Sequence, residues 1–423
     1  MIKFIIKGLL RDRSRSLLPV LVVTAGVFLC VVATSWMQGV LNEVTWSTAI
    51  FNAGHVRVMT HAYAQEADQM PNDLALLNIS GLMDTLRTQF PGWYWTPRIQ
   101  FGGLLDVPDA QGETRSQAPV MGMAVDLLGK NSREPKILNL EKSLVKGRLP
   151  QQPGEILISD VLAGRLAVKL DSTATLLSST MYGSISMYNF KVVGTVHFGY
   201  TALDRSVIIA DIADAQKALD MQDGAGEILG FTDDTIYRPR QAEAVKDKFA
   251  VLFTGTGDFD PVMEKLTDQP DMLDMYHIAK SVISSVVGFF VFIMAIVLWN
   301  TGLMGSIRRY GEMGIRLAMG EAKGHVYGSL LVESLGIGAM GAVLGTFIGL
   351  LVSLYLQNVG IDISSMMNDA VILVPNVMRA RITVASFVIG LSTGFFAPFL
   401  GTLISGVGIY RRQTSQLFKE LEV

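Results

Sequence analysis

The chain has 423 residues, one cysteine, 50% hydrophobic residues and only 17% charged residues, against roughly 25% charged residues in ordinary soluble domains. This composition excludes a disordered chain and a small fold held together by disulfides. The formal net charge of -3 provides no basic field that would attract nucleic acid, so we predict no nucleic-acid partner.

Residues 1–16 are predicted to form a cytoplasmic amphipathic segment. Its isoleucines and leucines share one helical face, and Lys3, Lys7 and Arg11 occupy the other. Such a segment can lie flat on an anionic inner leaflet. A simple cluster of charges that orients the first span explains the same residues equally well, and both interpretations stay open.

Four long apolar stretches, at residues 17–40, 278–304, 326–357 and 382–410, are predicted to be transmembrane helices. The first contains 24 residues without a charge, and a helix of that length crosses a hydrocarbon core of roughly 30 Å. A cleaved signal peptide is the alternative for this first stretch. We reject it because the apolar run is too long and no small-residue cleavage site follows it.

Basic residues flank these spans unequally. They cluster before the first span, in residues 305–325 and in the tail 411–423, whereas the loop 358–381 carries only Arg379 and Arg381. The positive-inside rule therefore places both termini in the cytoplasm and residues 41–277 outside. This pattern predicts a multi-pass membrane protein, and the lack of cysteine in residues 41–277 is compatible with a bacterial inner membrane and periplasm.

Residues 41–277 contain most of the prolines of the chain and are predicted to form a periplasmic α+β domain. Periodicity predicts strands at 55–60, 155–159, 190–197 and 206–210, and helices at 74–90, 160–169, 212–220 and 241–253. Asp160 and Asp211 stand where helix N-caps are expected. The only cysteine lies in the first span, so this domain must be held by its own core.

Patterns that indicate enzyme chemistry fail on inspection. The string Gly390-Leu-Ser-Thr-Gly394 has the spacing of a nucleophile elbow but lies in the middle of a span, which favours helix packing. Gly129-Lys130 lacks the serine or threonine that a phosphate loop requires. The five histidines have no zinc-ligand spacing. We therefore predict no catalytic residue, no metal and no cofactor, and no binding of ATP by a phosphate loop of this chain.

The third span carries two features of interest. Gly341, Gly345 and Gly349 form a stripe of small residues on one face, which predicts close packing against another helix. Glu333 is the acid of this span. Snorkelling or pairing with a cation explains it at least as well as a role in proton transport.

The segment between spans two and three is the most specific part of the sequence. It reads Ser306-Ile-Arg-Arg-Tyr-Gly-Glu-Met-Gly-Ile-Arg-Leu-Ala-Met-Gly320. This closely resembles the coupling segment of the MacB/FtsX/LolCE group of ABC transporter permeases. The arrangement of one span, a large outer domain and three further spans is similar to that group, and Ala53-Gly-His-Val-Arg-Val58 is similar to permeases that release lipoproteins.

This resemblance implies a transport subunit without catalysis of its own. Two permeases, identical or different, would pair with two cytoplasmic ABC ATPase subunits, and ATP-driven closure would move the outer domains by mechanotransmission. Substrates of such machines include lipoproteins, peptides and amphiphiles, and a periplasmic protein is an open partner. A transmembrane signalling regulator, driven by the same kind of ATPase without transport, is the alternative. The residues implied to contact the ATPase are Arg308, Arg309, Glu312, Gly314, Arg316 and Gly320.

Overall fold

The computed structural model describes residues 13–109, 111–233, 237–363 and 377–411 and divides the chain into two compact units. We call residues 1–41, 276–361 and 378–423 the helical unit, and residues 42–275 and 362–377 the sheet unit. The greater part of the predicted amphipathic segment 1–16 and of the tail 411–423 lies outside the described residues.

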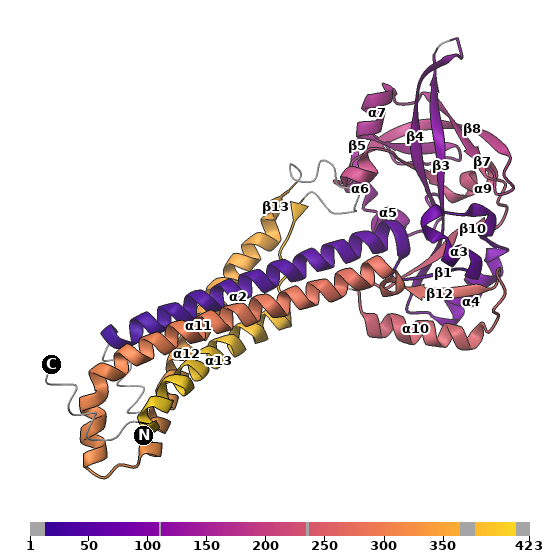
Figure 1. The fold of residues 1–423 in the computed structure, drawn as a ribbon. Helices are drawn as coiled ribbons and strands as arrows, with labels where there is room; N and C mark the ends of the chain where they lie inside the picture. The colour runs from indigo at the N-terminus through magenta and orange to yellow at the C-terminus, as the bar shows by residue number, and fades with distance from the viewer. Residues whose placement is uncertain (1–12, 110, 234–236, 364–376, 412–423) are drawn as a thin grey trace. The chain divides into compact units, whose positions relative to one another are not determined.

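Four long apolar helices build the described part of the helical unit, and they lie side by side in Figure 1. Each is long and apolar enough to cross a membrane. They continue past the predicted spans, since α2 runs eight residues beyond Val40 and α11 runs fourteen beyond Met304. The helices are α2 (Arg13–Thr48), α11 (Pro270–Ala318), α12 (Lys323–Val359) and α13 (Val384–Arg411).

A ten-stranded mixed sheet forms the centre of the sheet unit. Its order is β12-β1-β11-β3-β4-β9-β6-β8-β5, and β7 pairs with both β3 and β8. The strands are β1 (Val56–Thr60), β3 (Tyr94–Pro108), β4 (Thr114–Val125), β5 (Leu144–Gly147), β6 (Glu155–Ser159), β7 (Thr173–Ser179), β8 (Ile185–Val196), β9 (Val207–Asp211), β11 (Glu227–Phe231) and β12 (Pro261–Lys265). Short strands outside this sheet are β2 (Leu76–Leu77), β10 (Gly224–Ala225), β13 (Ile361–Asp362) and β14 (Val377–Met378).

Strand β3 divides the sheet into two parts. Its first residues, Tyr94–Arg98, pair with β11, and its remaining residues pair with β4. From Ile99 onward the pairing closes a ring, because β3 pairs with β4, β4 with β9, β9 with β6, β6 with β8, β8 with β7 and β7 again with β3. A closed ring leaves no exposed edge among its strands.

Short helices cover this sheet. They are α3 (His61–Gln65), α4 (Ile79–Gln89), α5 (Glu134–Ile137), α6 (Leu140–Ser143), α7 (Asp160–Leu166), α8 (Thr201–Asp204), α9 (Ile212–Ala218) and α10 (Pro239–Leu252), with the 3-10 turns η2 (Ala67–Gln69), η3 (Asn72–Leu74) and η4 (Leu266–Asp268). A five-residue π-helical turn, η1 (Ala49–Ala53), follows α2 directly. Four long apolar helices with a mixed sheet domain between the first and second confirm the predicted fold class.

Several predicted elements of this unit need correction. The helix expected at 74–90 begins only at Ile79, because Asn78 adopts a left-handed conformation with φ 53° and separates it from β2. Asp160 is not an N-cap, since the Ser159 hydroxyl accepts the bond from the Leu162 N–H. Asp211 does cap its helix, as predicted. The long hairpin of β3 and β4 was not expected at all.

Candidate coupling sites

The predicted ATPase-contact residues follow one another along the last turns of α11. Arg308, Arg309, Glu312, Gly314 and Arg316 all lie in this continuous helix, which ends at Ala318. A helix turns about 100° per residue, so the positions of the three arginines and the glutamate fall within an arc of about 100°, whereas Gly314 falls outside that arc. Of these side chains, the structure describes that of Arg316, which is exposed.

A tight turn of four residues then joins α11 to α12. Gly320 has φ +91°, a left-handed conformation that suits glycine and ends the helix. The Glu321 N–H donates to the Arg316 carbonyl oxygen at 3.1 Å, and the Glu321 carboxylate lies 3.6 Å from His325 Nε2. Met319, the first residue of the turn, is 75% exposed. The segment is therefore a helix end and a defined turn.

The glycine stripe of α12 packs against α2. A Cβ atom on Gly341 would lie 2.7 Å from Val23 Cβ, and one on Gly345 would lie 2.6 Å from the Thr24 carbonyl oxygen. One on Gly349 would meet Val31 Cβ at 2.8 Å. The absence of side chains lets the two helix backbones approach closely. The glycine face of α12 is thus covered by α2 of the same chain.

The Gly390–Gly394 string packs in the same way from α13. A Cβ atom on Gly390 would meet Thr346 Oγ1 at 2.6 Å, and one on Gly394 would meet Ala342 Cβ at 2.5 Å. Both contacts are with α12, so the helix-packing interpretation of this string is confirmed. With the glycine stripe, it makes α12 the helix that contacts both α2 and α13 through small residues.

A second candidate site lies in the sheet unit, where the strands next to the two long helices meet. Strand β1 follows α2 and η1, strand β12 precedes η4 and α11, and these two strands pair with each other from Val56↔Lys265 to Thr60↔Pro261. We call this pair and its charged side chains the root of the sheet unit. The root therefore joins the segment that leaves α2 to the segment that enters α11, and its paired residues are more than 200 positions apart in sequence.

Arg57 holds the root together across three strands. Its Nη1 donates to Glu227 Oε1 on β11 at 2.8 Å, and its Nη2 donates to Glu264 Oε2 on β12 at 3.0 Å. Burial alone would lower the pKa of Arg57, but Glu227 and Glu264 more than offset it and raise that pKa. Burial raises the pKa of Glu227, and Arg57 opposes that rise. The Arg57 guanidinium therefore compensates the charge of a buried carboxylate.

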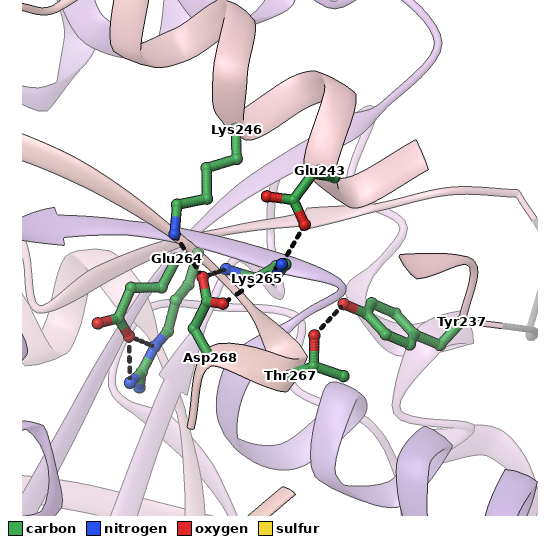
Figure 2. A network of polar contacts seen from close by, with 8 residues as sticks. Tyr237, Glu243, Lys246, Glu264, Lys265, Thr267 and Asp268 are labelled. Atoms are coloured by element: carbon green, nitrogen blue, oxygen red, sulfur yellow. Dashed lines mark hydrogen bonds and ion pairs between the residues drawn. The ribbon is translucent and has the colours of Figure 1, made fainter. Parts of the chain in front are cut away.

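A second set of ion pairs fastens the connection into α11 (Figure 2). From α10, Lys246 Nζ donates to Asp268 Oδ2 at 2.6 Å and the Glu243 carboxylate accepts a bond from Lys265 Nζ. The Glu243 carboxylate raises the pKa of Lys265. Although burial opposes it, Lys246 holds the pKa of Asp268 below its usual value. These contacts tie α10 to the turn that precedes Pro270.

Apolar contacts complete the root. Ala49 and Ala53 of η1 are buried against Leu266 and Met272, with Trp46 packed against them. Gly54, which follows η1, has φ +62° and ψ -172°, a conformation open to glycine, and a Cβ there would lie 2.7 Å from the Val56 carbonyl oxygen. Residues that follow α2 and residues at the start of α11 thus share one small hydrophobic core.

Sequence patterns missed the root almost entirely. Arg57 belongs to the string 53–58 that resembles lipoprotein-releasing permeases, but its partners lie 170 and 207 residues away. Among the described residues, no group of three or more histidine, cysteine, aspartate or glutamate side chains could hold a metal ion. The chemistry visible at both sites is that of ion pairing and helix packing.

Comparison with known protein families finds a match for the last third of the chain. A family model described as FtsX-like permease C-terminal matches residues 284–414. These residues are similar to the carboxyl-terminal domain of FtsX-like permeases. The matched region begins within α11 and contains the predicted coupling residues, the turn at Gly320, the glycine stripe and α13. With four candidate spans, the chain is a multi-pass membrane protein.

Other comparisons extend beyond the matched region. No curated protein matches the chain by sequence. Among solved structures, the chain is similar to the crystal structure of the periplasmic region of MacB from Actinobacillus actinomycetemcomitans, with a TM-score of 0.36 and 13% identity. That similarity covers 53% of this chain and 97% of the MacB region. The permease family normally lacks catalytic activity of its own.

Proposed function

We propose that the chain is the permease subunit of an ABC transporter that couples ATP hydrolysis by a separate cytoplasmic ATPase to movement of a periplasmic domain. The observation that carries this proposal is the continuity of α11. Its 49 residues correspond to about 73 Å of helix, against a hydrocarbon core of about 30 Å. The coupling residues lie at its carboxyl end, and the ion pairs of the root precede its amino end.

A transmission element must be stiff, and the contacts of the described residues support that requirement. Close glycine packing holds α2 against α12, and ion pairs hold the turn before α11 to α10. Closure of the ATPase pushes the end of α11, and the helix carries the displacement to the root. Nucleotide changes the conformation only through contacts that differ between the two ATPase states.

The assembly contains two permeases and two ATPase subunits in the inner membrane, with the sheet unit in the periplasm. Basic residues near the proposed cytoplasmic ends support this orientation. The substrate class is a lipoprotein, peptide or other amphiphile that is released or exported without passing through a central pore. This class rests on the resemblance of the coupling segment and of residues 53–58.

The proposal is tested by reconstituting the permease with its ABC ATPase in vesicles. Wild-type chain should stimulate ATP hydrolysis and support release of a substrate lipoprotein to an acceptor. Glu312→Lys should lower stimulated hydrolysis or uncouple it from release, while membrane insertion stays intact. Glu321→Lys is the matched control, because it makes the same charge change beyond the end of α11 and should have the smaller effect.

Two results would contradict the transporter. Equal coupled activity of Glu312→Lys and wild type would remove the coupling segment from the mechanism. If the chain stimulates ATP hydrolysis but transfers no lipoprotein, no peptide and no other amphiphile, the signalling regulator is favoured instead.

A further inference from the structure

A fully buried ion pair lies where the π-helical turn after α2 meets the sheet. Arg98 Nη2 donates to Glu134 Oε2 at 2.8 Å and Arg98 Nε donates to Glu134 Oε1 at 3.0 Å. The two side chains are 1% and 0% exposed. Thr96 Oγ1 adds a third bond to Glu134 Oε1 at 2.9 Å. Every oxygen of this carboxylate is therefore engaged away from water.

The remaining nitrogen of the guanidinium reaches the π-helical turn itself. Arg98 Nη1 donates to the Ile50 carbonyl oxygen, and Gln100 Nε2 donates to the Phe51 carbonyl oxygen at 3.4 Å. Carbonyl groups at the end of a helix have no partner within the helix. A cation beside them is also favoured by the helix dipole. Two side chains of β3 thus donate to carbonyl groups of η1.

Arg98 occupies a particular position in the sheet. It is the last β3 residue that pairs with β11, opposite Glu227, and Ile99 is the first that pairs with β4. Its guanidinium also lies 5.6 Å from the centre of the Phe231 ring on β11. One side chain therefore links η1, α5 and β11 from the position in β3 that directly precedes the ring of strands.

Apolar and aromatic contacts hold the same turn beside the ion pair, and the Phe51 ring meets the rings of Phe198 and Tyr200 edge-on at 5.2 Å between centroids. Ile50 and Phe51 are buried in a core cluster with residues of β4, β6 and β9. Hydrophobic burial is non-directional, whereas a bidentate guanidinium has fixed geometry. A buried ion pair is weak support for stability but can specify one arrangement among several. These facts assign the pair a positioning role.

We propose that Arg98 and Glu134 form a latch that fixes the π-helical turn to β3, so that displacement of α2 moves the ring of strands instead of being absorbed by the turn. This inference rests on the proposed function for what drives α2. Arg98 is a positioning residue, and its effect is separate from the folding of the sheet unit. Removal of both charges should leave the fold and lose the transmission.

The first test measures the latch without any ATPase. A spin label is placed at the exposed Asn52 of the full-length chain on a Cys30→Ala background, with a label at exposed Thr173 as control. Arg98→Met combined with Glu134→Leu leaves no lone buried charge, so the thermal unfolding midpoint should change little. The Asn52 label should become more mobile, whereas the Thr173 label should not change.

The second test adds the ATPase and nucleotide. In the same double variant, the nucleotide-driven change in distance between labels on the paired sheet units should fall by about two- to tenfold relative to wild type. ATP hydrolysis should continue. Arg98→Lys keeps the positive charge but cannot make the bidentate contact with Glu134, so it should give an intermediate distance change.

Unchanged mobility at Asn52 together with an unchanged distance change would overturn the latch. If the double variant fails to fold, Arg98→Lys, which keeps the charge but loses the bidentate contact with Glu134, takes its place, and an unaltered Asn52 spectrum in that variant overturns the proposal equally. If wild-type chain shows no nucleotide-driven movement, the proposed function fails, and the Asn52 measurement still decides whether the pair holds the turn.

Discussion

Close packing of the glycine stripe leads to a quantitative prediction for Gly345. In Gly345→Ala, the new Cβ would lie 2.6 Å from the Thr24 carbonyl oxygen and 2.8 Å from Val27 Cβ. The first distance is about 0.8 Å below the 3.4 Å at which ordinary van der Waals contact begins. Since one of the atoms is backbone, a rotamer change cannot relieve the clash, and α2 and α12 must separate.

The cost of this separation should be about 1 to 3 kcal/mol, the usual range for an extra carbon in a well-packed core. Gly328→Ala is the matched control. It lies in the same helix, a Cβ there meets nothing within 4 Å, and alanine favours a helix over glycine by up to about 1 kcal/mol. The control should therefore be as stable as wild type or slightly more stable.

The only cysteine of the chain provides the assay. Cys30 is buried in α2, between the positions of Val27 and Val31 that contact the stripe and α13. A thiol-reactive fluorophore in detergent should label it at a lower temperature in Gly345→Ala than in wild type and Gly328→Ala. Equal labelling temperatures for all three proteins would refute the inference that the stripe is a tight contact between α2 and α12.

Three further predictions concern topology, the root and pH. On a cysteine-free background, an impermeant thiol reagent applied to intact spheroplasts should label Thr173→Cys and not Met319→Cys; the reverse would invert the proposed topology. Arg57→Met should lower the free energy of unfolding by about 3 to 5 kcal/mol because it leaves Glu227 buried without its partner. Arg57→Met with Glu227→Leu should recover much of that loss, and no recovery would argue against the ion pair as the cause. Arg148, which donates to Glu155, lowers the pKa of that carboxyl to about 2. The stabilising contribution of this ion pair is therefore present above the ordinary pKa of about 4.5 and is lost as pH falls toward 2. Between pH 4.5 and pH 2, the thermal unfolding midpoint of Glu155→Gln should therefore fall less than that of wild type. Identical dependence of the two midpoints on pH would contradict this assignment.

Local sequence determined the features that depend on neighbouring residues. Uncharged runs long enough to cross a bilayer specify helices whatever surrounds them, because a backbone in lipid must satisfy its own hydrogen bonds. Strand β6 has the predicted bounds, Glu155 to Ser159, since alternating β-branched and apolar residues fit a buried strand. The coupling segment was recognisable because its residues are contiguous.

Only the tertiary structure decided which distant residues meet. Arg57 and Glu264 are separated by 207 residues, and Arg98 and Glu134 by 36, so no local pattern predicts either ion pair. The glycine stripe specified close packing, but its partner α2 lies more than 300 residues earlier in the chain. The capping by Ser159 instead of Asp160 followed from the path of the chain out of β6. Burial and pairing depend on the whole fold, and they make two pairs of charged residues, one at the root and one beside η1, candidates for transmission.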